Sequence, residues 1–165
     1  MTFSSETLAA LGNSLPGARA FAHHANSSTK GYACGGSDDI DWLTSIDALT
    51  FSTETAATIA ATIAVAFSVG GSVQSSTRGY FGGNSNLTTT IHGIRFDTEA
   101  TLTTGAALAT ARYRNTGCYS SSRGYFCGGN DDNNVVAEID GIRFDTEASI
   151  NPSAALATAR ENACA

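Results

Sequence analysis

The chain has 165 residues and a formal charge of −6, and only 15% of its residues are charged. It therefore lacks the basic footprint that nucleic-acid binding requires, and we expect no nucleic-acid partner. The abundance of Gly, Ser, Thr and Ala favours short strands and tight turns over a core of large aromatic side chains.

The longest apolar run, residues 59–69, has about half the length needed to cross a bilayer, so we expect no membrane span. The first residues lack the basic region and the continuous apolar stretch of a signal peptide. We therefore expect a soluble protein made in the cytoplasm, with later incorporation into a virion left open.

A short phrase, Gly-Tyr followed by two Gly, recurs at 31–36, 79–83 and 124–129. Equivalent phenylalanines, Phe3, Phe51, Phe96 and Phe144, are 48, 45 and 48 residues apart, a period typical of propeller blades. The pattern predicts a partial repeat at 1–18, full repeats at 19–66, 67–111 and 112–159, and the start of another at 160–165. The landmark residues are Tyr32, Gly35, Gly36, Tyr80, Gly82, Gly83, Tyr125, Gly128 and Gly129, with Arg19, Arg112 and Arg160.

Each repeat is predicted to contain four strands. The first strands are expected at 20–25, 68–73 and 113–119, and the second strand is the Gly-Tyr element. The third strands, at 45–51, 91–96 and 139–144, have apolar residues on both faces, which indicates burial between neighbouring sheets. The fourth strand lies in the Ala/Thr-rich run that follows. Helix is the alternative there, because residues 54–61 are good helix formers, but the equivalent runs contain Gly105 and Pro152.

Charged residues recur at fixed places in the repeats. Glu6, Glu54, Glu99 and Glu147 are expected to accept backbone N–H bonds in a turn, because a catalytic group rarely needs a copy in every repeat. The recurring Arg19, Arg112 and Arg160 are expected to pair with these glutamates or their neighbours between blades. The histidines His23, His24 and His92 are interpreted as structural or surface residues.

The segments after the paired glycines vary in length and are polar and acidic. Loops of this kind on a rigid scaffold are frequent binding sites, so we take them as the surface for a ligand or partner. Their oxygens suggest Ca²⁺ as an alternative, although no complete calcium loop is present, and no other cofactor is expected. The candidate residues are Asp38, Asp39, Asp41, Trp42, Asn84, Asn86, Asn130, Asp131, Asp132 and Asn133.

The four cysteines are interpreted mainly as buried thiols. Cys34 and Cys127 occupy the same repeat position, so they lie too far apart for a disulfide. A disulfide between Cys118 and Cys127, which flank an expected hairpin, stays open as an alternative. The spacing of the cysteines, including Cys164, matches no paired zinc-ligand pattern.

From Phe3 to Arg160, the pattern resembles kelch-type repeats, and more closely the Gly-Tyr-Phe-x-Gly-Gly arrays of phage virion and tail proteins. The resemblance implies a β-propeller with four short antiparallel strands per blade. At 48 residues per blade the chain would supply about 3.4 blades, fewer than the four to eight of a ring. The ring would then be completed by oligomerisation or by a longer chain.

We therefore expect a non-enzymatic structural or interaction protein, a phage-like, virion- or tail-associated propeller. Its partners would be other copies of itself, other structural subunits or a host-surface glycan. The alternative is a lectin-like glycan-binding module in which Tyr32, Tyr80, Tyr125 and Trp42 stack on sugars. An enzyme is the least favoured class, because no Gly-x-Ser-x-Gly element with suitable His and Asp partners is present.

Overall fold

The structure is a computed structural model that describes residues 13–66 and 69–162. Within these ranges the fold is all-β, with no helix and therefore no helix that could span a membrane. The predictions made for Phe3, Glu6, Phe67, Cys164 and most of the partial repeat at 1–18 fall outside the described residues.

The described strands form three antiparallel sheets of four, and in each sheet the strands are neighbours in chain order. The first sheet contains β1 (His23–Asn26), β2 (Lys30–Cys34), β3 (Ser45–Thr50) and β4 (Thr55–Thr62). The second contains β5 (Gly71–Gln74), β6 (Arg78–Gly82), β7 (Thr90–Arg95) and β8 (Thr101–Ala107). The third contains β9 (Thr116–Tyr119), β10 (Arg123–Cys127), β11 (Ile139–Arg143) and β12 (Ser149–Ile150).

The Ala/Thr-rich runs are strands, as predicted, and the helical alternative is wrong. β4 and β8 pair with the preceding strand along most of their length, because alternation of small and β-branched residues suits a partly exposed sheet edge. In the third sheet the equivalent strand, β12, has only two residues. Pro152, which cannot donate a ladder hydrogen bond, stands two residues after its end.

The first strands begin later than predicted. Phe21, Val69 and Arg114 occupy the same repeat position, and all three have φ near +60°. A left-handed residue cannot continue a strand, so β1, β5 and β9 begin only two residues further along the chain. Five of the paired glycines, Gly35, Gly36, Gly83, Gly128 and Gly129, have positive φ, whereas Gly82 lies within β6.

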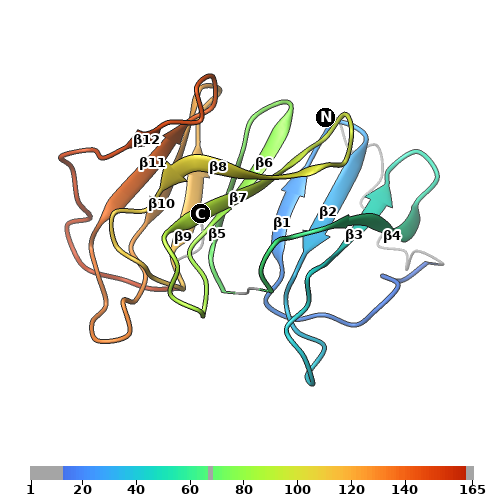
Figure 1. Cartoon of the computed structure of the whole chain (residues 1–165), viewed down its shortest axis with the longest axis horizontal. Coiled ribbons are helices and arrows are strands. Elements are labelled where there is room, and N and C mark those ends of the chain that lie inside the picture. Colours follow the sequence, from blue (N-terminus) through green and yellow to red (C-terminus); the bar gives the residue numbers. More distant parts are fainter. Residues whose placement is uncertain (1–12, 67–68, 163–165) are drawn as a thin grey trace, which may run out of the picture.

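The three sheets lie side by side (Figure 1), and the hydrophobic core is divided between the two gaps that separate them. β1 contacts β5, and β5 contacts β9, so the first strands of consecutive sheets are neighbours. The middle sheet is covered on both sides, and β7 is accordingly buried along most of its length. Ile94 belongs to the core shared with the first sheet, and Ile91 to the core shared with the third.

Candidate functional site: the sheet joints and the loop face

The contact between the first two sheets, here called joint 1, is built around the aromatic ring of Tyr32. This ring stacks on Phe96 of the second sheet, with centroids 5.6 Å apart and planes 4° from parallel. The Tyr32 hydroxyl donates a hydrogen bond to Glu99 Oε1 at 3.3 Å, and Lys30 Nζ lies 2.6 Å from the same oxygen. Burial, reinforced by the negative charge of Glu99, raises the pKa of Tyr32 to about 12.

The contact between the second and third sheets, joint 2, repeats this arrangement. Tyr80 stacks on Phe144 with centroids 5.5 Å apart and planes 4° from parallel. Its hydroxyl donates to Glu147 Oε1 at 3.2 Å, and Arg78 Nη1 lies 2.5 Å from that oxygen. Each joint therefore brings a tyrosine face, made by a cation and a Tyr on the second strand, against a glutamate face, made by a Phe and a Glu on the next sheet.

Glycine at the first position of the Gly-Tyr phrase lets the sheets approach closely. A Cβ added at Gly79 would lie 2.5 Å from Ala25 Cβ of the first sheet. At Gly124 it would lie still closer to Val73 of the second sheet, whereas at Gly31 the nearest atom would be Phe51 Cε1, at 3.4 Å. Gly79 and Gly124 thus accept a side chain from the neighbouring first strand, and Gly31 faces away from both joints.

The two expectations for the recurring charges are corrected by these contacts. Among the described residues, the Glu99 and Glu147 carboxylates accept no turn N–H group; they contact Lys30 and Arg78 of the preceding sheet, from residues with φ values of 56° and 52°. Within the same ranges the recurring arginines form no ion pair between sheets. Arg19 contacts Asp47 of its own repeat at 2.6 Å, and both side chains are buried.

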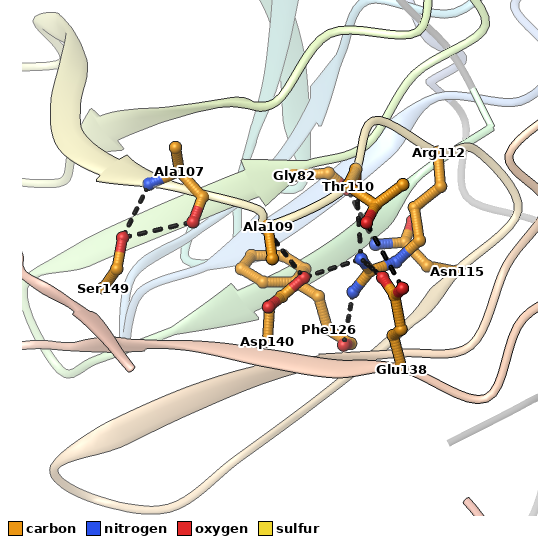
Figure 2. Close-up of polar contacts among 10 residues, drawn as sticks. All are labelled: Gly82, Ala107, Ala109, Thr110, Arg112, Asn115, Phe126, Glu138, Asp140 and Ser149. Carbon is orange, nitrogen blue, oxygen red and sulfur yellow. Dashed lines mark hydrogen bonds and ion pairs between the residues drawn. The ribbon is translucent and has the colours of Figure 1, made fainter. Parts of the chain in front are cut away.

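Figure 2 shows the equivalent pair in the third repeat, where Arg112 Nη1 lies 2.6 Å from Asp140 Oδ2. Arg112 also donates to the Phe126 carbonyl and contacts Glu138, so its charge is held inside the repeat. In the middle repeat the Arg position is Phe67 and the Asp position is His92. Burial lowers the pKa of His92, which favours the neutral form of its ring. Among the residues that the structure describes, the Arg160 side chain donates one hydrogen bond, to the Thr158 carbonyl, and forms no ion pair.

The segments between the second and third strands project at one end of the three sheets, the lower end in Figure 1, and form what we call the loop face. Asp38 Oδ1 accepts hydrogen bonds from the backbone N–H groups of Ile40 and Asp41. Asp131 Oδ1 accepts in the same way from Asn133 and Asn134. These bonds lower the pKa of both carboxyls, because they stabilise the charged form.

The predicted contact residues are not equally accessible on this face. Asp38, Asp39, Asp41, Asn86, Asp132 and Asn133 are exposed, and Asn130 and Asp131 are partly exposed. Asn84 is buried: its amide donates to Thr88 Oγ1 and its oxygen accepts from the Asn86 N–H, so it shapes the loop and cannot contact a partner.

Apolar side chains lie at the loop tips, where the sequence analysis named Trp42 as a candidate contact residue but missed Ile40 and Val135. Ile40 is 87% exposed and Trp42 is 49% exposed, in a loop that is otherwise acidic. Val135 is also exposed and occupies the position of Trp42 in the third repeat. The signal was present in the sequence, because Ile40 and Trp42 alternate with Asp39 and Asp41. In the described ranges, no three His, Cys, Asp or Glu side chains gather as metal ligands.

The opposite end of the sheets contains two equivalent grooves, one above each joint. They have volumes of about 430 Å³ and 370 Å³. Each is lined by hydroxyls of two Ser/Thr turns together with an Arg, a Phe and an Asp, which are Arg95, Phe96 and Asp97 in one and Arg143, Phe144 and Asp145 in the other. Tyr32 and Tyr80, expected to stack on sugars in the lectin alternative, are buried in the joints, so that part of the prediction is wrong.

Three of the cysteines lie among the described residues, and all three are free thiols. Cys34 is buried, which raises its thiol pKa to about 12. Cys118 is exposed, and its Sγ lies 3.9 Å from that of buried Cys127. The expectation of buried thiols is thus confirmed for Cys34 and Cys127 but not for Cys118.

Comparison of the chain with models of known families and with curated proteins finds no match.

Proposed function

We propose that the chain is a non-enzymatic structural or interaction protein whose repeats act as blades of a kelch-like β-propeller, in a phage-like virion or tail assembly. The propeller arrangement is supported by two joints of the same construction and by contacts between successive first strands. Sheets related by one repeated rotation, with their first strands adjacent, are the elements from which a ring of blades is made.

A role without catalysis is supported by the partners of the acidic side chains. Asp47 and Asp140 neutralise buried arginines, and Glu99 and Glu147 hold the joints. Asp38 and Asp131 cap their own loops. These recurring carboxylates therefore form ion pairs or hydrogen bonds that stabilise the fold.

The observation that carries the proposal is the loop face. Exposed Ile40 and Trp42 stand together on a loop that is held by its own hydrogen bonds, with exposed acidic groups around them. Apolar and aromatic anchors within a polar rim are typical of protein interfaces. We infer that this face contacts another structural subunit.

The test is co-sedimentation of the protein with assembled particles from its source, measured by mass spectrometry across a density gradient. The proposal expects the wild-type chain in a particle fraction, and a variant carrying Ile40→Ser and Trp42→Ser at the top of the gradient. The matched control is Tyr119→Ser, because Tyr119 is also exposed but ends β9 at the opposite end of the sheet from the loop face. A wild-type protein found only at the top of the gradient would contradict the proposal.

The two grooves favour glycan binding as a second candidate. Sugar hydroxyls can pair with Arg and Asp side chains and with serine and threonine hydroxyls, all of which line these grooves. A thermal-shift screen with simple sugars would test this candidate, because a ligand that binds only the native state raises the melting temperature. The shift should disappear in the Arg95→Ala, Arg143→Ala double variant and persist in the loop-face variant.

A further inference from the structure

Both outer sheets carry half of a joint on the side that faces away from the middle sheet. The first sheet has an outer glutamate face, defined by Gly31, Leu49, Phe51 and Glu54. The third sheet has an outer tyrosine face, defined by Cys118, Arg123 and Tyr125. These residues occupy the same repeat positions as the residues that build joints 1 and 2.

The outer glutamate face has the backbone of a joint without its contacts. Glu54 has a φ of 53°, close to the values of Glu99 and Glu147, so its carboxylate leaves the chain in the same local geometry. In the described part of the chain its side chain forms no ion pair or hydrogen bond. Phe51 is 46% exposed, and Leu49 is partly exposed, although the equivalent Ile94 and Ile142 are fully buried.

The outer tyrosine face likewise lacks the contacts that its equivalents make in joints 1 and 2. Tyr125 is partly exposed, whereas Tyr32 and Tyr80 are buried. Arg123 is exposed, and its guanidinium contacts no acidic side chain among the described residues. Cys118 occupies the repeat position of Ala25 and Val73, the buried residues that pack on the joint glycines. Unlike them, Cys118 is exposed.

We propose that a second copy of this chain docks head to tail, its outer tyrosine face against the outer glutamate face, to form a third joint. This inference rests on the proposed structural role and names the partner for it. Arg123 of one copy pairs with Glu54 of the next, as Arg78 pairs with Glu147 within the chain. Tyr125 stacks on Phe51, and Cys118 packs over Gly31.

The charges and shapes of the two outer faces favour a second copy of this chain as the partner. The glutamate face supplies an anion, an exposed ring and a glycine, and the tyrosine face supplies a cation, a phenol and a small side chain. Two faces of the same kind would place like charges together, so a symmetric pairing through either face is disfavoured. A head-to-tail contact is heterologous, and its repetition closes into a ring when the rotation between sheets divides a full turn.

The test is a charge exchange, with assembly measured by sedimentation velocity and light scattering at several protein concentrations. Glu54→Arg alone and Arg123→Glu alone should each weaken self-association at least tenfold, because each places like charges in the joint. The variant that carries both exchanges should recover wild-type assembly. So should an equimolar mixture of the two single variants, because every contact between one variant and the other then pairs opposite charges. The matched control, Arg95→Glu, changes an exposed charge of the middle sheet and should assemble as the wild type does.

A second measurement fixes the geometry. Arg123→Lys keeps the cation, as Lys30 does in joint 1, and provides an amine that a carbodiimide can join to a nearby carboxylate. Peptide mapping should find residue 123 linked to Glu54 in the cross-linked dimer and not in the monomer. A wild-type chain that stays monomeric, as it would if another part of the same chain covered these faces, overturns the inference. So does assembly that neither single exchange weakens, or a dimer without the link. None of these results affects the loop-face variants, which test the proposed function separately.

Discussion

The first position of the Gly-Tyr phrase offers a test of joint packing with an internal control. The perturbation is Gly→Ala at Gly79 and, separately, at Gly31. At Gly79 the new Cβ would lie 2.5 Å from Ala25 Cβ, a separation that real Cβ atoms do not tolerate. Ala25 has no side-chain torsion through which its Cβ could withdraw, so one backbone must shift. At Gly31 the nearest atom would be 3.4 Å away, which is ordinary contact.

Overpacking of a core typically costs about 1–3 kcal/mol, so we expect Gly79→Ala to lower the free energy of unfolding by about 2 kcal/mol. For a domain of this size, that corresponds to a fall in melting temperature of about 4–8 °C. Gly31→Ala should change stability by less than about 0.5 kcal/mol, as surface substitutions usually do. Adding Ala25→Gly removes the opposing methyl and should recover more than about 0.5 kcal/mol as a coupling energy in a double-mutant cycle.

The assay is urea unfolding monitored by fluorescence and circular dichroism, at concentrations where light scattering shows only single chains. Working with single chains excludes an effect of Gly31 through contacts with a second copy. Equal destabilisation at Gly31 and Gly79 would refute the reasoning, since the two positions share sequence context and differ only in what lies above them. A neutral Gly79→Ala would refute it as well.

Three further predictions concern the charged groups. Glu99→Gln should lower stability by about 1 kcal/mol in urea unfolding, because it weakens a partly exposed ion pair and a tyrosine hydrogen bond, whereas Glu54→Gln should leave single chains unchanged. Arg19→Met should cost about 3–5 kcal/mol by leaving the Asp47 carboxylate buried and unpaired, and adding Asp47→Leu should recover most of it. Burial lowers the pKa of His23 to about 3, so below pH 6.5 the unfolded chain binds a proton that the folded chain does not. The free energy of unfolding should therefore fall by about 1.4 kcal/mol for each pH unit below 6.5. His23→Gln should flatten this slope in unfolding curves measured between pH 4 and 8.

The strand pattern could be predicted from the sequence because equivalent positions in different repeats are expected to have the same secondary structure. Helix formers at 54–61 were outweighed by Gly105 and Pro152 in the equivalent runs, and β4 and β8 are indeed strands. The start of each first strand was missed, since Phe21, Val69 and Arg114 give no sign of a left-handed backbone. Side-chain type does not encode it, because Phe, Val and Arg all favour negative φ.

The partners of the recurring charges were harder to predict, because they depend on which face of a sheet meets its neighbour. Lys30 and Glu99 are 69 residues apart, and nothing local connects them. The buried pair of Arg19 and Asp47 could have been found, since the middle repeat replaces both members at once, with Phe67 and His92. A buried charge whose partner is removed is strongly destabilising, so a repeat that loses the cation is expected to lose the anion as well.

The middle repeat shows which recurring residues are required for the fold of a single sheet and which are required for contacts between sheets. It lacks the buried ion pair, yet its four strands keep the same order and pairing as those of the other two sheets. The joint residues, in contrast, are present in every repeat, including Glu54 and Arg123 on the outer faces. Phe51, Glu54 and Arg123 are exposed among the described residues, so they add little stability to their own sheets. Their presence at the positions that form joints 1 and 2 is accounted for if the outer faces are also covered, and by a surface of the same construction.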